Sequence, residues 1–557
     1  MNRGLLTYWL SKTLKRKFQK RKHAEAHPNL IIKGQQAVAL TSQGKLADAE
    51  AIYKDLIAKG SANYAVFGNL AALCGMQGRF EELIDLLNKA IELNPDYPEA
   101  HNNLGIALQK RGDLNEAILS FNRALKLKKN FPEAYNNLGI AHQEQGELNK
   151  AITSFHKAIK LRPGYAEAHY NLGNTFKDKE DLDSAINCYT TAIKLKPNYA
   201  DAHNNLGVVL QMNGNLEAAW VSYNNALAAK PEHADANNSI SFYLLQTGNY
   251  ASGWEKHEWR SKTEKPSLPH ANPICPRLDS ENLADINQIL IVSEQGFGDT
   301  LQFMRYVLAL KQRGISTSLC AQPKLHSLIQ ASGIEASPLT PDQANQVTDG
   351  HWLPLLSLPK HLDVRPDNPI ITEPYIKTTN ALDTKWRTIL SEEQRPIIGI
   401  NWQGSLSHEI TTSKGRSIPL EAFAPIATHS NTKLLSLQKG FGAEQLDTCS
   451  FKEHFVSCQN QVNDTWDFLE TAAIISNCDL IITSDTAVAH LAGGMGKTTW
   501  LLLKKVPEWR WGLEGDSTFW YPTMRLFRQS EPGNWTEVIQ RVKLALQQQL
   551  DNTSLET

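Results

Sequence analysis

The chain has 557 residues, of which 41% are hydrophobic and 21% charged, and its formal net charge is −1. These values are typical of a soluble globular protein of two to four domains, and a nearly neutral chain creates no overall field that would favour nucleic acid. The seven cysteines are scattered, odd in number and never spaced as Cys-x-x-Cys, which excludes a complete disulfide framework and disfavours a cysteine-rich metal site. We therefore expect a cytoplasmic protein without a metal site.

The N-terminal extension, residues 1–29, has a short apolar patch followed by basic residues between 12 and 22. A signal peptide carries its positive charge before the apolar segment, so this order disfavours one. Two interpretations stay open. The segment is either an interfacial helix on an anionic membrane, which would place the protein peripherally at the inner membrane face, or a solvated cap of the region that follows.

Residues 30–261 repeat with a period of 34 residues. Glycines recur at this step, with Glu180 in one of the places: Gly44, Gly78, Gly112, Gly146, Gly214 and Gly248. Within one unit, Leu104 and Leu108 line a first helix and Phe121 a second, at the spacing of a helix face. A period of 34 with two helices per unit is typical of tetratricopeptide repeats, which stack into an α-helical solenoid.

Asparagine occupies one equivalent position in five of these units, directly before the leucine of the first helix: Asn69, Asn103, Asn137, Asn171 and Asn205. Asparagine inside a helix costs roughly 0.5 kcal/mol relative to alanine. Its amide both donates and accepts hydrogen bonds, which suits the binding of an extended peptide backbone. The alternative is that duplication copied the residue with each unit and that it forms hydrogen bonds between repeats.

The second half of the chain is predicted to be α/β. A proline-rich segment, 262–286, separates it from the repeats, as a linker or an ordered wrap. Short apolar runs alternate with helical patterns, which predicts parallel sheets covered by helices. The expected strands are 288–293, 318–321, 397–402, 434–437 and 480–483. We expect two Rossmann-like lobes, 287–393 and 394–550, with a last helix over 535–550.

Two strand-to-helix turns carry the candidate chemistry. The loop 294–299 contains Gly296 and Gly298, which allow a ligand to approach the backbone, and it ends in Asp299, a candidate general base. The alternative is that Asp299 only caps the following helix, an effect worth about 1 kcal/mol. At the second turn, Asp485 and Thr486 either cap the following helix or contact a ligand, and that helix presents an N-terminus suited to a phosphate group.

Six motifs occur in order along residues 288–540: EQGFGDTLQFMRY, GINWQG, GRSIPLEAF, SLQKG, SDTAVAHLAG and VPEWRWGLEGDSTFWYPTMRLFRQ. As a set they resemble the heptosyltransferase-like glycosyltransferases (glycosyltransferase family 9-type), in the variant fused to tetratricopeptide repeats. The resemblance implies a glycosyltransferase-B fold, with the acceptor on the lobe 287–393 and the sugar nucleotide mainly on the lobe 394–550.

The same resemblance implies roles for single residues. Asp299 is the catalytic base that takes the proton of the acceptor hydroxyl, and Arg416 lies at the donor pyrophosphate. The donor-binding segment holds Asp485, Thr486 and His490. The transfer would be independent of metal and need no cofactor besides the nucleotide sugar. The repeats resemble those of O-linked N-acetylglucosamine transferase, whose groove asparagines bind peptide.

Three functions follow from these patterns. The first is a glycosyltransferase that modifies a protein or glycan acceptor recruited by the repeats. The second is an adaptor whose transferase fold has lost turnover and whose repeats bind protein. The third is a transferase acting on lipopolysaccharide or another envelope glycan, and only the basic N-terminal extension supports this function.

Overall fold

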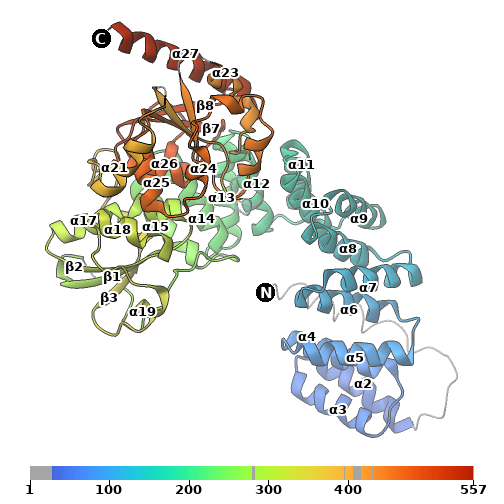
Figure 1. Ribbon diagram of the computed structural model, residues 1–557. Helices are drawn as coiled ribbons and strands as arrows, with labels where there is room; N and C mark the ends of the chain where they lie inside the picture. Colours follow the sequence, from blue (N-terminus) through green and yellow to red (C-terminus); the bar gives the residue numbers. More distant parts are fainter. Residues whose placement is uncertain (1–27, 279–282, 394, 406–414, 429–431, 556–557) are drawn as a thin grey trace. The chain divides into compact units, whose positions relative to one another are not determined.

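The computed structural model describes residues 28–278, 283–393, 395–405, 415–428 and 432–555 (Figure 1). The predicted membrane contact through residues 12–22 and most of the loop 405–414 lie outside these ranges. The chain forms two compact units, Met1–Leu210 and Gln211–Thr557.

The first unit consists of helices paired as antiparallel neighbours: α2 (Pro28–Ser42), α3 (Leu46–Ala58), α4 (Tyr64–Met76), α5 (Phe80–Leu93), α6 (Pro98–Arg111), α7 (Leu114–Leu127), α8 (Pro132–Glu144), α9 (Leu148–Leu161), α10 (Ala166–Asp178), α11 (Leu182–Leu195) and α12 (Ala200–Met212). One unit of the 34-residue period contributes one pair of helices, such as α6 and α7. The predicted helical repeats are therefore confirmed.

Small residues bring the two helices of a repeat together. A Cβ added at Gly105 of α6 would lie 2.6 Å from the ring of Phe121 on α7, and one at Gly139 would lie 2.6 Å from Phe155. The turn between the helices needs a left-handed residue: Gly112 has φ 96°, and Glu180, which stands in a glycine position, has φ 62°. The glycine pattern therefore has two physical causes, close helix packing and turn geometry.

The second unit begins with three further repeat helices, α13 (Leu216–Ala229), α14 (Ala234–Gln246) and α15 (Tyr250–His257), followed by the 3₁₀ helix η1 (Glu258–Ser261). Leu245, Tyr250 and Trp254 belong to the same apolar core as the first sheet. The Trp254 indole N–H donates to the carbonyl of Val364 at 2.7 Å, and the Gln246 amide donates to the carbonyl of Pro507 at 3.0 Å. These helices therefore fold as part of the α/β unit.

Two parallel sheets form the rest of this unit. The first has the order β2-β1-β3, from β1 (Gln288–Val292), β2 (Ser316–Cys320) and β3 (His351–Pro354). The second has the order β5-β4-β6-β7-β8, from β4 (Ile397–Asn401), β5 (Lys433–Ser436), β6 (Leu480–Ser484), β7 (Thr499–Leu503) and β8 (Met524–Arg528). The five predicted strands are present, and β3, β7 and β8 are additional.

Helices connect and cover the strands: α16 (Phe297–Phe303), α17 (Arg305–Gln312), α18 (His326–Ala331), α19 (Pro341–Asn345), α20 (Leu358–His361), α21 (Asn380–Ile389), α23 (Ala424–Ala427), α24 (Gln459–Asn463), α25 (Phe468–Ser476), α26 (Ala487–Gly494) and α27 (Trp535–Leu555). On the second sheet, Val538, Ile539 and Val542 of α27 pack with Ile398 and Ile482 in one buried cluster. No helix in the described part of the chain is long and apolar enough to cross a membrane.

The proline-rich segment is an ordered wrap over its described residues, 262–278. The backbone N–H of His270 donates to Ser293 and that of Leu278 donates to Trp352, each at 2.9 Å. Cys275 donates to Val347 at the same distance. The segment therefore runs along the first sheet and its neighbouring loop, and proline suits it because few regular ladder hydrogen bonds are required.

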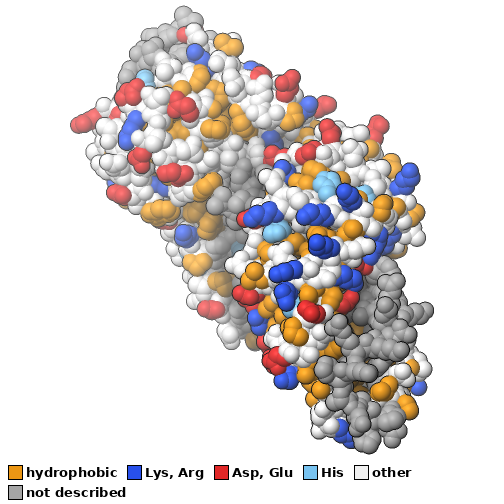
Figure 2. All heavy atoms as spheres, turned by 90° about the vertical axis from the view of Figure 1, so that its right-hand side faces the viewer, with side chains coloured by type: hydrophobic (Ala, Val, Ile, Leu, Met, Phe, Trp, Pro, Cys, Tyr) orange, Lys and Arg blue, Asp and Glu red, His pale blue; other side chains and the backbone are white. Residues whose placement is uncertain are grey.

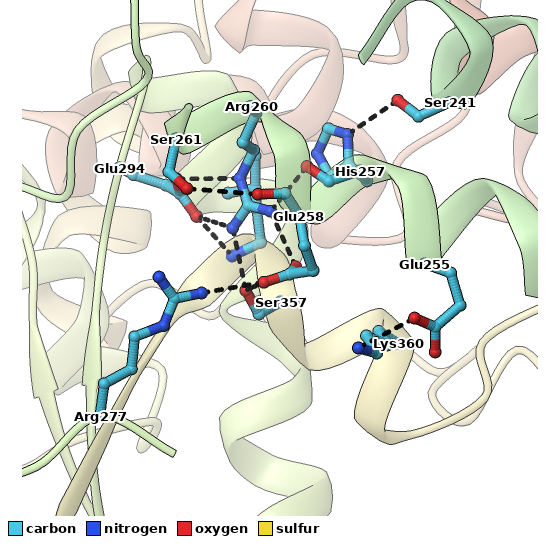
Figure 3. A network of polar contacts seen from close by, with 11 residues as sticks. Ser241, Glu255, His257, Glu258, Arg260, Ser261, Arg277, Glu294, Ser357 and Lys360 are labelled. Atoms are coloured by element: carbon cyan, nitrogen blue, oxygen red, sulfur yellow. Dashed lines mark hydrogen bonds and ion pairs between the residues drawn. The ribbon is translucent and has the colours of Figure 1, made fainter. Parts of the chain in front are cut away.

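A buried ionic network joins η1 to the first sheet (Figure 3). The Arg260 guanidinium donates to both carboxylate oxygens of Glu294, at 2.7 and 3.1 Å, and to Glu258 at 2.8 Å. Glu258 also accepts from the Ser357 hydroxyl and from Arg277. The side chains of Arg260 and Glu294 are 4% and 1% exposed, so this is a fully desolvated charge pair. It attaches the end of the last repeat to the residue that opens the glycine loop.

Candidate functional site

Asparagine side chains link consecutive repeats in the first unit. The Asn137 amide donates to Asn102 at 3.0 Å, that of Asn171 donates to Asn136 at 3.0 Å, and that of Asn205 donates to Asn174 at 2.9 Å. Each bond spans neighbouring helix pairs. Hydrogen bonding between repeats, the alternative use of these residues, is therefore present at three positions, while peptide binding stays a prediction for all five, including Asn69 and Asn103.

Sequence reasoning missed the residues that precede these asparagines. Asn102, Asn136 and Asn204 are buried, whereas the asparagine after each is only half-buried. In the unit where Tyr170 replaces the first asparagine, its hydroxyl accepts from Asn205 at 3.1 Å. The doublet in the recurring letters NNLG was the available signal, because the second asparagine of one unit donates to the first asparagine of the unit before it.

In the second unit, Asp299 lies in the first turn of α16. One carboxylate oxygen accepts the backbone N–H of Gly296 at 2.9 Å, and the other forms an ion pair with Arg510. The side chain is 18% exposed. Asp299 therefore caps its helix and also faces the loop that follows β7, so the two interpretations of this residue are compatible.

The glycine loop packs closely on α26. A Cβ added at Gly298 would lie 3.0 Å from the ring of His490 and 3.6 Å from the Cα of Ala487. A Cβ at Gly296 would meet only the Asp299 carboxylate, at 3.4 Å. Gly298 is thus required where the loop of the first sheet contacts the helix that follows β6 in the second sheet, and the two candidate turns lie side by side.

His490 is buried between aromatic rings. Its Nδ1 lies 2.9 Å from the Tyr521 hydroxyl, and its ring stacks on Trp511 with centroids 5.5 Å apart. Burial, together with the nearby charges of Arg510 and Arg305, holds the pKa of His490 well below its usual value. The imidazole is therefore neutral near pH 7 and contributes shape and a hydrogen bond rather than positive charge.

Arg416 reaches the crest of the β6–α26 turn. Its guanidinium donates to the carbonyl of Asp485 at 2.9 Å, and it packs so closely on Gly404 that a Cβ there would clash with it. Burial raises the pKa of Asp485, and the Arg416 charge opposes this shift. Thr486 donates to the Asn401 amide oxygen at 2.8 Å. Arg416, Asp485 and Thr486 thus lie together at the carboxyl ends of β4 and β6.

Arg510 and Glu508 complete the cluster, and sequence reasoning did not single them out. The Arg510 guanidinium bonds to Glu508 at 2.5 Å and to the Gln302 side chain at 2.5 Å, besides its pair with Asp299. Burial raises the pKa of Glu508 to about 7, although Arg510 opposes the shift. The Glu508 side chain is one-third exposed, so solvent reaches this carboxyl group. The only sequence signal was a charged pair among tryptophans, in PEWRW.

The cluster can bind an anion and hold a proton. Arg416 and the N-terminus of α26 supply positive potential, and Asp299 and Glu508 are carboxylates within reach of one guanidinium. Within the described residues, no group of three or more His, Cys, Asp or Glu side chains is arranged to hold a metal ion.

Comparison with known proteins identifies the repeats. A family model described as "TPR repeat" matches residues 76–112, 108–146, 144–179 and 173–214. No curated protein matches the chain. Three solved structures illustrate the similarity. The structure of YrrB, "a TPR protein with an unusual peptide-binding site", is 22% identical, covers 34% of this chain and 97% of its own, and has a TM-score of 0.29.

A crystal structure of MamA is 28% identical and covers 30% of this chain and 96% of its own, with a TM-score of 0.28. The structure of TTC0263, a thermophilic TPR protein in Thermus thermophilus, is 22% identical and covers 33% of this chain and 99% of its own, with a TM-score of 0.29. The N-terminal region of this chain thus consists of tetratricopeptide repeats, which indicate a scaffold for protein–protein interaction.

Proposed function

We propose that the protein is a glycosyltransferase that moves a sugar from a nucleotide-sugar donor to a protein or glycan acceptor bound by the repeats. The observation that carries the proposal is the contact between the two turns of the α/β unit. The glycine loop with Asp299 meets α26, whose N-terminus lies beside Arg416, and Arg510 bridges to Asp299. This contact supports the proposal because it brings the proposed base, Asp299, close to the proposed anion site.

The donor pyrophosphate would bind at the N-terminus of α26, beside Arg416 and the backbone of Asp485. In the transfer, the acceptor oxygen forms a bond to the anomeric carbon and gives its proton to the Asp299 carboxylate. The bond from that carbon to the phosphate oxygen breaks, and the nucleoside diphosphate leaves with the electron pair. Arg416 and the helix N-terminus stabilise the developing negative charge.

A second candidate is a scaffold without turnover. Both carboxylate oxygens of Asp299 already have partners within the protein, the N–H of Gly296 and the Arg510 guanidinium. A base held in this way must keep a lone pair free or exchange a partner before it accepts a proton. Action on an envelope glycan stays a third prediction, because its evidence lies in residues 12–22, outside the described ranges.

Titration calorimetry with UDP-, GDP-, ADP- and dTDP-sugars tests the proposal. We expect one nucleotide sugar to bind saturably to the wild type, and Arg416→Ala and Asp485→Ala to lose that binding at least tenfold. Asn103→Ala, in the other compact unit, is the matched control and should bind the donor normally. Asp299→Asn should bind the donor and fail to transfer. If no nucleotide sugar binds to folded wild-type protein, the transferase proposal is wrong and the scaffold becomes the better assignment.

A further inference from the structure

Basic residues gather at the C-terminal ends of three second helices in the repeats. The segments 121–130, 155–164 and 189–198 contain no acidic residue. Their basic residues are Arg123, Lys126, Lys128, Lys129, Lys157, Lys160, Arg162, Lys194 and Lys196. Figure 2 shows Lys and Arg side chains collected on one face of the repeats. A local excess of positive charge therefore exists in a chain whose formal net charge is −1.

Three of these cations have a structural use inside the repeats. Lys128 pairs with Glu99 at 2.8 Å and Lys196 with Glu167 at 3.4 Å. Arg162 pairs with Glu133 in the same way. Each also lies over an aromatic ring three residues later, with the Lys128 ammonium 4.2 Å from the centroid of Phe131, for example. These cations are neutralised and connect one repeat to the next.

Six cations remain, and the five that lie within helices form what we call the basic strip: Arg123, Lys126, Lys157, Lys160 and Lys194. All five are exposed. Lys126, Lys160 and Lys194 occupy the same place in α7, α9 and α11, one 34-residue period apart. Within the described residues, none of the five forms an ion pair, and Lys157 lies 5.5 Å from the ring centroid of Tyr135. Their charge is therefore available to another molecule.

The strip is limited to three repeats. In the repeat before it, the equivalent positions are Lys89 and Glu92, which pair with each other at 2.7 Å. In the repeat after it, the equivalent positions are the uncharged Asn225 and Ala228. Duplication alone would have copied the cations into every unit. Because the cations stop on both sides, the strip is a surface limited to three repeats and not a feature of every unit.

Apolar side chains lie between the cations. Leu161 and Leu195, which directly follow Lys160 and Lys194, are 39% and 42% exposed. The aromatic rings within these segments, such as Phe121 and Phe155, are fully buried and cannot stack on a nucleic-acid base. Glu99, Glu133 and Glu167 are neutralised by their own cations and do not reduce the charge of the strip. A narrow ligand with both acidic and apolar groups fits better.

We propose that the basic strip binds a linear protein segment in which acidic residues alternate with apolar ones. This surface lies on the second helices of the repeats, whereas the asparagines discussed above lie on the first helices. Complementary charge would steer the encounter, and the exposed leucines would add contact area. The inference deepens the scaffold role of the repeats and does not depend on glycosyl transfer.

The test uses the full-length chain and a fluorescein-labelled 20-residue peptide of alternating Glu and Leu residues, and binding is read by fluorescence anisotropy. Charge reversal at three strip positions, K126E/K160E/K194E, should raise the Kd at least tenfold, and the Lys→Gln triple variant should have an intermediate effect. The matched control, K110E/K150E/K179E, changes the net charge equally at exposed lysines of the same repeats and should change the Kd less than twofold. Circular dichroism verifies that all variants stay helical.

Two further probes separate other partners from the proposed one. A 20-nucleotide single strand of DNA and vesicles of phosphatidylcholine with phosphatidylglycerol should bind more weakly than the peptide in 150 mM salt. The proposal is overturned if the strip and control variants weaken peptide binding equally, or if the peptide does not bind the wild type. It is also overturned if DNA or vesicles bind more tightly than the peptide and lose that binding in the strip variant.

Discussion

Replacing Arg260 by methionine should destabilise the α/β unit by about 3–5 kcal/mol, because it leaves a buried carboxylate without its counter-charge. Glu294 is 1% exposed and receives two hydrogen bonds from Arg260, at 2.7 and 3.1 Å. Its carboxylate also accepts the backbone N–H of Leu356, at 3.2 Å. One neutral donor cannot replace a guanidinium, so the loss should lie well above that of an ordinary surface substitution.

Urea denaturation followed by tryptophan fluorescence measures this loss. All tryptophans except Trp9 lie within Gln211–Thr557, so the signal reports mainly on the second unit. The double variant Arg260→Met/Glu294→Gln should recover more than half of the loss, because it removes both members of the desolvated pair. Arg365→Met is the control: its ion pairs with Asp363 and Asp367 are exposed, and we expect a change below about 1 kcal/mol.

Two results would refute this reasoning. The first is a loss for Arg260→Met no larger than that of the Arg365 control. The second is a double variant at least as unstable as the single one, which would mean that the shape of the Arg260 side chain matters and its charge does not.

Three other predictions follow from the same structure. Gly139→Ala should cost about 1–3 kcal/mol, since its Cβ would lie 2.6 Å from the ring of Phe155, whereas Gly164→Ala has open space and should change stability by less than about 0.5 kcal/mol in thermal or urea unfolding. A fragment 262–557 should aggregate or unfold, while 211–557 should unfold cooperatively in circular dichroism, because Leu245, Tyr250 and Trp254 belong to the α/β core; equal behaviour of the two fragments would contradict this. In the folded protein Glu508 has a pKa of about 7, above its usual value of 4.5, so the folded state binds the proton more tightly than the unfolded state does. The stability that this group contributes therefore falls as pH rises from about 4.5 to 7. Glu508→Gln should flatten that part of the curve of urea midpoint against pH, and an unchanged curve would contradict the assignment.

The repeats could be predicted because their determinants are local. Gly112 is recognisable from its spacing, and its left-handed turn and the packing of Gly105 on Phe121 both arise within one 34-residue unit. The predicted strands were apolar runs of the kind that parallel sheets bury on both faces. The strand β3 escaped prediction because its four residues include His351 and Pro354, which weaken the strand signal.

The candidate site could be predicted only in part. Asp299 and Asp485 follow apolar runs and precede helices, so each turn was visible in the sequence. The contact of Asp299 with Arg510 joins residues 211 positions apart, and no local pattern encodes it. The same holds for the change of compact unit at Leu210, since the 34-residue period continues through Gly214 and Gly248 without interruption. Side-chain contacts over long separations decide both features.

The placement of the last repeat helices also bears on how the chain folds during synthesis. The bond from Gln246 to Pro507 spans 261 residues. At ribosomal rates of about 5–20 residues per second, its second partner emerges roughly 13–50 s after the first. Helices of the first unit can pair as soon as they leave the ribosome, because their contacts are close in sequence. Tyr250 and Trp254 must wait, with their rings uncovered, until the sheets are complete. The nascent chain therefore exposes an apolar helix pair for that interval, and this segment is where we expect a chaperone to be needed.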